Sequence, residues 1–500
     1  MPFLSGSHPI LDCVTAAAWE ARIFGGDESK EWPAMQAAGA AVADGIIHDL
    51  KTVSETLTAK PGRLLVLVGK GHNGGDALIA ATRLLAAAPA WTVEVGFVFG
   101  QNRLRPLTLA AWRQLQHAGG SARVRAIRRR EMAASYTVVI DGVFGFQFRP
   151  PLREPATGWL QQAADVKTSL RAAVDLPSGW AEAVAFQADV TYATGILKSP
   201  LLDLPNAGRI RYLDLGFFGD DAVGNLRVLT AAGLAPLQQL RSFHSDKRSH
   251  GHLAIVGGSR DFPGAVGLSV AAALHSGVGN VTAFVPESIS AAFAARWPEA
   301  MWVGCPETED GGLSLDAGQR IRTKWARASA ALVGPGLGRD PETMALVKDL
   351  IGEAKIPLVL DADALQPEGV MAGNAPRILT PHQGEFDRIT TSKNVALDAL
   401  AWPQPTVTVL KGPITRVIQD GVIYHGVAGG PVLARGGSGD MLAGLIAGRL
   451  AAEPGTPLVA AAQGVVWHGL ASQRVADSRG EVAVRSSWLI DEINGVLRAL

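Results

Sequence analysis

A glycine-rich turn followed by an aspartate is the stretch of this sequence that most directly indicates chemistry. Residues 436–440 read GGSGD, and the apolar run MLAGLIAG follows at once. The first turn of a helix carries N–H groups without helical acceptors and the positive end of the helix dipole, so it attracts anions. Glycines also let the backbone approach a phosphate closely. Because Asp440 would repel a phosphate, we interpret it as a base that takes a proton from an attacking hydroxyl.

Four further motifs in the second half follow predicted strands and carry groups suited to phosphate or metal. They are VGPGLGRD at 333–340, LDADAL at 360–365, LTPHQGE at 379–385 and LKGPIT at 410–415. Asp361 and Asp363 are carboxylates of the kind that hold Mg²⁺, and Lys411 and Thr415 flank a Gly-Pro turn suited to a nucleotide phosphate. Each motif alone also fits an ordinary turn, so the interpretation depends on their order along the chain.

Three strand ends in the first half bring further oxygen-bearing side chains. The segments are VGKGHNGGDALIA at 68–80, VVIDGVFG at 138–145 and AAVDLPSGW at 172–180. Asn73, Asp141, Asp175 and Ser178 offer amide, carboxylate and hydroxyl oxygens suited to a hard cation. Helix capping and strand termination explain the same residues equally well, so residue type and spacing leave both interpretations open.

Composition limits the class of protein. The 500 residues are long enough for two or three domains, and Lys plus Arg equals Asp plus Glu at 46 each, so no charge excess indicates nucleic acid or an anionic membrane. The two cysteines, Cys13 and Cys305, have no metal-binding spacing and fit a reducing compartment. No apolar stretch reaches the ~18 residues of a membrane span, and the start lacks the pattern of a signal peptide. These features predict a cytoplasmic protein.

Short apolar runs alternate with amphipathic stretches, a pattern typical of parallel strands covered by helices on both faces. The predicted strands are 63–69, 92–99, 136–142, 171–175, 188–194, 209–215, 252–257, 281–285, 330–334, 357–361, 377–380 and 406–411, with helices at 9–24, 32–50, 76–88 and 104–118. Residues 415–427 predict a hairpin that turns at Asp420-Gly421. Residues 225–250 leave the sheet pattern and are expected to contain no strand. The prediction is two open three-layer α/β domains, Rossmann-like over 1–225 and ribokinase-like over 226–500.

The motifs of the second half resemble, in order and spacing, those of the ADP- or ATP-dependent NAD(P)H-hydrate dehydratases, a ribokinase-like family. The matching motifs are GGS at 257–259, GPGLG at 334–338, DADAL at 361–365, TPHQGE at 380–385, KGPIT at 411–415 and GGSGD at 436–440. The resemblance implies a hydrated NADH or NADPH substrate, NAD(P)HX, bound by Ala265, Gly336, His382 and Asp440, with Asp440 catalytic. It implies Mg²⁺ and an adenine nucleotide held by Lys411, Gly412, Pro413, Ile414, Thr415, Gly437, Ser438 and Gly439.

The first half resembles the NAD(P)H-hydrate epimerases through NGGD at 73–76, VVID-x-VFG at 138–145 and VDLPSG at 174–179. The resemblance implies a potassium ion held by Asn73, Asp141 and Ser178, with Asp141 catalytic. It implies substrate contacts from His72, Asn73, Gly74, Gly75, Asp76 and Asp175.

Three departures from the epimerase pattern predict a weakened epimerase. His72 stands where the family has asparagine, Trp180-Ala181 replaces Ile-Asp, and Phe146-Gln147-Phe148 replaces Thr-Gly-Leu in a loop where bulk would crowd an entering nicotinamide. In the second half the family's HKG is replaced by DKRSHG, which keeps Lys247 and places Arg248 at the glycine.

Other readings of the sequence stay open. The chain could be a ribokinase-like small-molecule kinase whose first half is a binding or assembly module. A dehydrogenase is disfavoured because no GxGxxG turn is followed by the required acidic residue. We expect ADP rather than ATP as phosphate donor, and a homo-oligomer of four or more copies.

Overall fold

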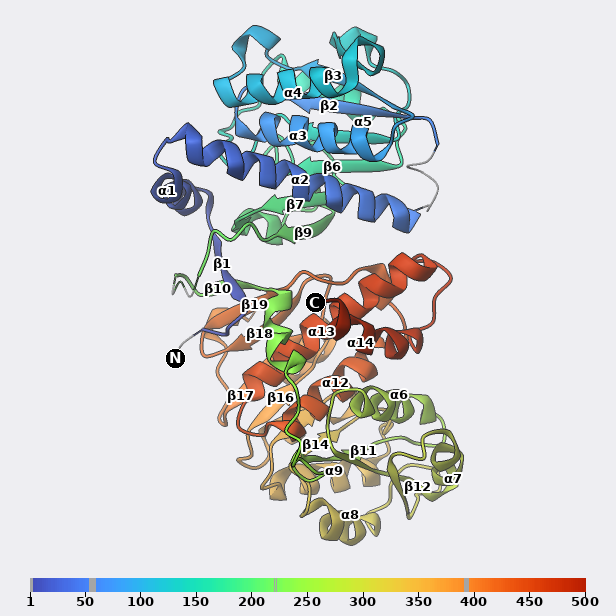
Figure 1. Cartoon of the computed structure of the whole chain (residues 1–500). Helices are drawn as coiled ribbons and strands as arrows, with labels where there is room; N and C mark the ends of the chain where they lie inside the picture. The colour runs from blue at the N-terminus through green and yellow to red at the C-terminus, as the bar shows by residue number, and fades with distance from the viewer. Residues whose placement is uncertain (1–2, 54–59, 220, 222, 391–394) are drawn as a thin grey trace. The chain divides into compact units, whose positions relative to one another are not determined.

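The structure is a computed structural model that describes residues 3–53, 60–219, 221, 223–390 and 395–500. The chain forms two compact units, Pro9–Gly224 and Met1–His8 together with Asn225–Leu500. Each unit is an open, largely parallel sheet with helices packed on both faces (Figure 1). The predicted fold class of two three-layer α/β domains is therefore confirmed.

The unit Pro9–Gly224 has a seven-stranded parallel sheet in the order β4-β3-β2-β5-β6-β7-β9. Its strands are β1 (Ser7–Leu11, which starts before the unit), β2 (Gly62–Val68), β3 (Trp91–Phe97), β4 (Val124–Ile127), β5 (Val138–Gly142), β6 (Leu170–Val174), β7 (Val190–Thr194), β8 (Leu197–Lys198) and β9 (Arg209–Leu213). Its helices are α1 (Cys13–Phe24), α2 (Glu28–Val53), α3 (His72–Ala87), α4 (Pro106–Arg123) and α5 (Ala156–Ala164). All six strands predicted for this half are present, and β1, β4 and β8 are additional.

Alternate residues of the central strand β2 enter different cores. Leu64 and Val66 pack in the core that includes residues of α2, α3 and α4, whereas Leu65 and Leu67 pack with Trp159 of α5. Both faces of the strand are therefore buried, which explains why its sequence is a continuous apolar run rather than an alternating one.

The second unit has a sheet in the order β13-β12-β11-β14-β15-β16-β17-β18-β19-β10. Its strands are β10 (Leu226–Leu229), β11 (His252–Val256), β12 (Asn280–Pro286), β13 (Met301–Cys305), β14 (Ala330–Val333), β15 (Leu358–Leu360), β16 (Arg377–Leu379), β17 (Thr406–Leu410), β18 (Thr415–Gln419) and β19 (Val422–Gly426). Its helices are α6 (Pro263–Leu274), α7 (Glu287–Arg296), α8 (Ala317–Trp325), α9 (Pro341–Glu353), α10 (Pro367–Met371), α11 (Gln383–Ile389), α12 (Ser438–Ala452), α13 (Pro457–Arg479) and α14 (Trp488–Ala499).

One expectation about this unit is wrong. The segment 225–250 does contain a strand, β10, which pairs in parallel with β19, so that Leu226 lies opposite Ile423. Its four residues are too short to produce a periodic signal, and the partner lies almost 200 residues away in the sequence. The predicted hairpin is confirmed, because β18 and β19 pair antiparallel around Asp420 and Gly421, both with positive φ.

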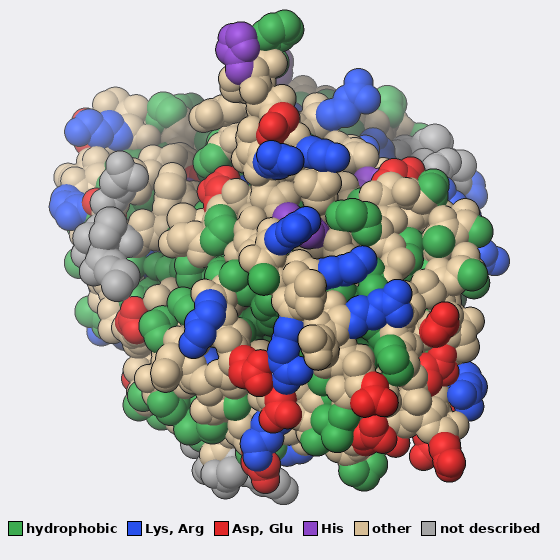
Figure 2. All heavy atoms as spheres, turned by 90° about the horizontal axis from the view of Figure 1, so that it is seen from below, with side chains coloured by type: hydrophobic (Ala, Val, Ile, Leu, Met, Phe, Trp, Pro, Cys, Tyr) green, Lys and Arg blue, Asp and Glu red, His purple; other side chains and the backbone are tan. Residues whose placement is uncertain are grey.

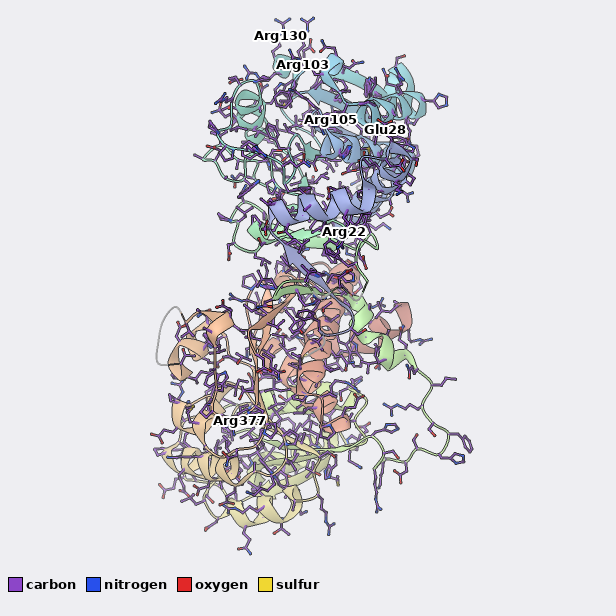
Figure 3. All side chains as sticks on the ribbon, turned by 90° about the vertical axis from the view of Figure 1, so that its left-hand side faces the viewer. Arg22, Glu28, Arg103, Arg105, Arg130 and Arg377 are labelled. Carbon is purple, nitrogen blue, oxygen red and sulfur yellow. The ribbon has the colours of Figure 1, made fainter. Side chains whose placement is uncertain are left out.

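The amino end of β16 is closed by a buried cation. Arg377 is 0% exposed, and its guanidinium donates hydrogen bonds to the carbonyl oxygens of Val370, Ala372 and Ala375 (Figure 3). Burial lowers the pKa of Arg377 to about 10. The carbonyls replace the water that the charge loses, so this side chain fixes the end of the sheet opposite to the predicted site.

The face shown in Figure 2 carries no excess of one charge, in agreement with the balanced composition. On the face shown in Figure 2, basic and acidic side chains are interspersed with apolar and neutral ones. None of the helices in the described ranges combines the length and the hydropathy of a membrane span.

Close packing of α6 against α12 generates a stability prediction. A Cβ at Gly444 of α12 would lie 2.2 Å from the carbonyl oxygen of Ser269 in α6. We expect Gly444→Ala to lower the free energy of unfolding by about 2 kcal/mol, because the helices must move apart to admit the methyl group. Chemical denaturation measures this change. The control is Gly455→Ala, whose methyl group meets no atom within 4 Å; equal stability of the two variants would contradict the packing argument.

Candidate active sites

The predicted substrate residues of the second unit lie where its strand order reverses. Strand β11 lies between β12 and β14. The chain leaves β11 toward β12 and leaves β14 toward β15, and these opposite directions open a crevice at the carboxyl ends. The loops after β11 and β14 meet there, with the Ser259 hydroxyl donating to the Gly336 carbonyl at 2.8 Å. A Cβ at Gly336 would lie 3.0 Å from that of Ala265. The structure thus brings Ala265 and Gly336 together.

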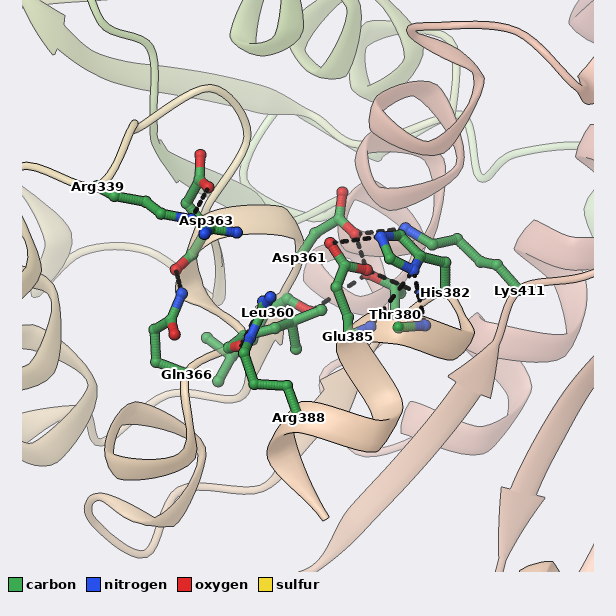
Figure 4. Close-up of polar contacts among 12 residues, drawn as sticks. Arg339, Leu360, Asp361, Asp363, Gln366, Thr380, His382, Glu385, Arg388 and Lys411 are labelled. Atoms are coloured by element: carbon green, nitrogen blue, oxygen red, sulfur yellow. Dashed lines mark hydrogen bonds and ion pairs between the residues drawn. The ribbon is translucent and has the colours of Figure 1, made fainter. Parts of the chain in front are cut away.

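A buried ion pair forms the floor of this site. The Lys411 ammonium lies 2.8 Å from Asp361 Oδ1, and the Thr380 hydroxyl donates to the same oxygen at 2.7 Å (Figure 4). Asp361 is 1% exposed. Burial lowers the pKa of Lys411, but the Asp361 carboxylate more than offsets this and raises the pKa above its usual value. Lys411 therefore stays charged in a partly dry site.

The glycine turn places a second positive feature beside this ammonium. Helix α12 begins at Ser438, directly after Gly437 with a φ of +87°. A Cβ at Gly439 would lie 3.3 Å from Lys411 Nζ, so the lysine head lies against the first helical turn. The free N–H groups of that turn and the lysine charge can act on the same anion. The loop from Gly412 to Thr415 follows Lys411 directly, and its Gly412 and Pro413 are exposed.

Asp440 lies in the same helical turn and is tied to α6. The Ser269 hydroxyl donates to the carbonyl oxygens of both Ala265 and Asp440, which joins α6 to the first turn of α12. Burial is the main cause that raises the pKa of Asp440 to about 6, followed by the nearby Asp361 carboxylate, and Lys411 opposes both. Near neutral pH this carboxyl is mostly ionised and close to its titration point, as a general base should be.

His382 caps helix α11 at the edge of the site. Its Nδ1 accepts hydrogen bonds from the N–H groups of Gly384 and Glu385, so the ring proton of the neutral imidazole lies on Nε2 (Figure 4). The side chain is 61% exposed. The Lys411 N–H donates to the carbonyl of Pro381, which keeps His382 beside Lys411.

The aspartates of DADAL do not form a shared metal site. Asp361 is bound to Lys411 and Thr380, whereas Asp363 accepts from the Gly338 N–H and faces Arg339 at 3.7 Å (Figure 4). The two carboxylates therefore have different partners, and burial raises the pKa of Asp363 despite the nearby Arg339. Within the described ranges, no group of three or more His, Cys, Asp or Glu side chains is arranged to hold a metal. We therefore route no chemical step through Mg²⁺ bound to this pair.

Sequence analysis missed three residues that shape this site. Thr380 holds Asp361, Ser269 joins α6 to Asp440, and His468 of α13 interacts with the backbone of Ser438. Burial lowers the pKa of His468 to about 4, and its Nε2 has no hydrogen-bond partner in the described structure. Ser269 and His468 lie in apolar helical sequence, and only the folded contact reveals them.

The first unit also collects its predicted residues at a reversal of strand order, between β2 and β5. The Gly69 N–H donates to the Gly142 carbonyl, and the Asn73 amide donates to the Phe144 carbonyl at 2.9 Å. Asn73, Gly74, Gly75 and Asp76 form the first turn of α3, which starts at His72.

Asp141 and Ser178 make a fully buried pair in this region. Asp141 accepts hydrogen bonds from the N–H groups of Val143 and Ser178 and from the Ser178 hydroxyl, the last two at 2.7 Å. Burial raises the pKa of Asp141 to about 6 despite these donors. The Ser178 hydroxyl also accepts from the Phe144 N–H. The Asn73 amide and the Ser178 hydroxyl both bond to the backbone of Phe144, so the structure brings Asn73, Asp141 and Ser178 together.

Asp175 supports the loop that departs from the epimerase pattern. Its φ is +68°, Oδ1 lies 2.5 Å from the ammonium of the buried Lys198, and Oδ2 accepts from the Phe146 N–H. The Phe146 ring packs beside the core of Trp19 and Phe218, and the Phe148 ring contacts the Phe144 ring in a tilted arrangement. Both aromatic rings are therefore used in packing.

A cavity of about 260 Å³ adjoins this loop. Its lining includes His72 and Asp76 from the predicted substrate set, and Gln147 is the residue of the altered loop that borders it. The two phenylalanines are not part of that lining. The expected crowding of an entering nicotinamide by this loop stays a prediction.

Comparison with known families assigns both halves. Residues 253–494 match the family described as NAD(P)H-hydrate dehydratase, and residues 33–199 match the YjeF-related protein N-terminus. A bifunctional NAD(P)H-hydrate repair enzyme of Gloeobacter violaceus is 35% identical, and the match covers 83% of this chain and 84% of the relative. The enzyme of that name from Thermofilum pendens is 31% identical, and the match covers 94% of this chain and 93% of the relative. An ADP-dependent (S)-NAD(P)H-hydrate dehydratase of Xanthomonas campestris is 35% identical, and the match covers 55% of this chain and 97% of the relative.

The fold and the matched families define a fusion of a dehydratase unit with a YjeF-related unit. The chain belongs to the family of bifunctional NAD(P)H-hydrate repair enzymes. The reading as a small-molecule kinase is not favoured, because the relatives that span both units carry the repair activity in their names.

The buried ion pair generates a prediction that needs no substrate. Lys411→Met leaves the Asp361 carboxylate buried without its cation, so we expect the free energy of unfolding to fall by about 3–5 kcal/mol. In Asp361→Asn/Lys411→Met no charge remains, and we expect part of that loss to be recovered. Denaturant unfolding of the wild type, both single variants and the double variant gives the coupling free energy. Simple additivity of the two single changes would contradict a direct interaction.

Proposed function

We propose that this protein repairs hydrated NADH and NADPH with two activities. The second unit dehydrates (S)-NAD(P)HX at the cost of a nucleotide phosphate, and the first unit interconverts the R and S epimers. The observation that carries the dehydratase assignment is the Lys411 ammonium against the first turn of α12, the turn that also contains the partly buried carboxyl of Asp440.

The dehydratase steps follow from these groups. The hydroxyl on the hydrated ring loses its proton to Asp440, and its oxygen attacks the terminal phosphorus of the nucleotide. The bond from that phosphorus to the bridging oxygen breaks, so ADP would leave as AMP. Lys411 and the N–H groups of Gly437, Ser438 and Gly439 stabilise the negative charge that develops on the phosphate oxygens. The new phosphate ester then leaves as inorganic phosphate with loss of a ring proton, which restores the double bond of NAD(P)H. Ala265, Gly336 and His382 would orient the substrate at the mouth of the crevice.

ADP is the phosphate donor that we propose. The Xanthomonas relative, which the match covers over 97% of its length, carries ADP dependence in its name. The nucleotide would lie over the loop formed by Lys411, Gly412, Pro413, Ile414 and Thr415. Mg²⁺ would accompany the nucleotide phosphates, where it would neutralise their charge.

The epimerase site is proposed to hold potassium through Asn73, Asp141 and Ser178. A monovalent cation would favour the ionised form of the buried Asp141, whose pKa burial raises to about 6. His72, Gly74, Gly75, Asp76 and Asp175 would contact the substrate. A cytoplasmic location and a homo-oligomer of four or more copies stay predictions, and sedimentation velocity measures the latter.

Removal of the proposed base tests the dehydratase. We expect Asp440→Asn to lower kcat by at least a thousandfold and to leave the KM for ADP within a few-fold, because the amide cannot accept the hydroxyl proton. The measurement is recovery of reduced nicotinamide absorbance from (S)-NADHX and ADP. Asp349→Asn, on an exposed position of α9, is the matched control. An Asp440→Asn variant as fast as this control would remove Asp440 from the mechanism.

The pH dependence of the wild-type dehydratase gives a second test. Asp440 acts as a base only when ionised, and its pKa is about 6. We therefore expect kcat/KM to rise as pH increases through about 6 and to level off above it. A rate that falls over this range would show that the protonated form is the active one.

Potassium dependence tests the epimerase. We expect replacement of K⁺ by tetramethylammonium to lower the interconversion rate of a pure NADHX epimer at least tenfold in the full chain without nucleotide. We also expect Ser178→Ala to raise the K⁺ concentration needed for half-maximal rate, because one oxygen ligand is lost. Rates that are insensitive to K⁺ in both proteins would contradict the ligand assignment.

A further inference from the structure

The cavity of the first unit is bordered by the motif at the start of α3 and also by two helices, α1 and α2, whose sequence gave no functional signal. Its wall is formed by α1, α2, the start of α3, and the segments around Gln147, Thr194 and Phe217. The polar side chains at its surface are Glu20, Glu31, His72, Asp76, Gln147 and Thr194. Phe24, Met35 and Phe217 supply an apolar surface. The cavity of about 260 Å³ lies just below the range of small-molecule sites, about 300–1,000 Å³, so it suits a single ring rather than a whole dinucleotide.

Two of its carboxyl groups lack the partners that buried carboxyls normally have. Asp76 is 9% exposed, borders the cavity and makes no hydrogen bond or ion pair with another described residue. Glu20 of α1 is partly exposed, borders the same cavity and likewise makes no such bond within the described chain. By contrast, Glu31 at the same cavity faces His72 Nε2 at 3.4 Å. A buried carboxyl without a partner is costly, and such groups point to a ligand or a proton-transfer role.

The surrounding charges adjust these two groups for proton exchange. Burial raises the pKa of Glu20 to about 7; Lys198 lowers it, while Asp175 and Glu31 raise it. Burial also raises the pKa of Asp76 well above its usual value, and Asp175 and Glu20 add to this, against Lys198. Glu20 therefore exchanges its proton near neutral pH, whereas Asp76 holds its proton more tightly.

We propose that Glu20 is the proton donor and acceptor at the hydrated carbon of NAD(P)HX, in the cavity that it shares with Asp76. This assignment deepens the proposed epimerase function and rests on it. It adds a helix, α1, and a residue outside the NGGD, VVID and VDLPSG motifs to the active site. The apolar residues Phe24, Met35 and Phe217 would hold the nicotinamide ring between the two carboxyls.

The chemistry balances with one proton and one water molecule. Protonated Glu20 donates its proton to the ring hydroxyl, the bond from that oxygen to the ring carbon breaks, and water leaves. The lone pair of the adjacent ring nitrogen forms a double bond to the carbon. A water molecule then attacks the opposite face and loses its extra proton to solvent, the Glu20 carboxylate takes up a proton from solvent, and the electron pair returns to nitrogen. The carbon is inverted, and the oxygen on it comes from water.

A kinetic comparison in the full chain without nucleotide tests the assignment. We expect Glu20→Gln to lower kcat for epimer interconversion at least a hundredfold with less than a fivefold change in KM. The matched control is Glu28→Gln, an exposed residue of α2 that is not among those bordering the cavity (Figure 3). Near-ultraviolet circular dichroism and the Tm of both variants establish that the unit is folded. Interconversion is followed by chromatography of the two epimers.

Two further measurements separate proton transfer from a structural role. The wild-type rate should fall as pH rises above about 7, where Glu20 loses its proton, and this decline should be absent from the residual rate of Glu20→Gln. In water labelled with a heavy oxygen isotope, the newly formed epimer should contain one labelled oxygen.

The outcomes are distinguishable. A wild-type chain that does not exceed the spontaneous rate overturns the proposed epimerase, and the role of Glu20 falls with it. An active wild type with an equally active Glu20→Gln variant overturns the Glu20 assignment alone. An active wild type whose product carries no labelled oxygen overturns the bond-breaking step.

Discussion

The dehydratase site depends on keeping a charged lysine in a partly dry crevice. Lys411 can remain there only because Asp361 lies at 2.8 Å and is itself held by Thr380. This pair fixes the ammonium against the first turn of α12, where the backbone N–H groups add to its charge. The same two groups also affect Asp440, whose pKa the Asp361 carboxylate raises and the lysine lowers. One ion pair thus positions the anion site and adjusts the neighbouring base.

Both units place polar side chains at a reversal of strand order, but the charged groups that they place there differ. Both place their polar groups where the strand order reverses, because loops that leave neighbouring strands in opposite directions open a crevice. The second unit places a paired cation in its crevice, which suits a polyanionic nucleotide. The first unit instead gathers the carboxyls of Glu20, Glu31 and Asp76 at a ring-sized cavity, an arrangement that would suit the proposed proton transfer on a neutral ring.

The sequence predicted what local patterns determine. Apolar runs located the main strands. The glycine-rich turn located the start of α12, Pro341 located the start of α9, and Asp420-Gly421 located the hairpin. Motif order located the residues that meet at the two strand-order reversals. The rest depends on contacts between distant segments. Strand β10 pairs with a strand almost 200 residues away, Ser269 joins two helices, and Glu20 reaches its cavity only because α1 packs beside α2 and α3. The packing of Phe146 beside Trp19 and Phe218 and of Phe148 against Phe144 likewise depends on the folded contacts.

Tracing the hydroxyl oxygen tests the central claim most directly. If the ring hydroxyl attacks phosphorus, then (S)-NADHX carrying a heavy oxygen isotope in that hydroxyl must transfer it to inorganic phosphate when the protein and ADP are in excess over the substrate. Mass spectrometry of the phosphate measures this. We predict one labelled oxygen per phosphate formed. Unlabelled phosphate, with the label released as water, would contradict the mechanism in which Lys411, α12 and Asp440 act together.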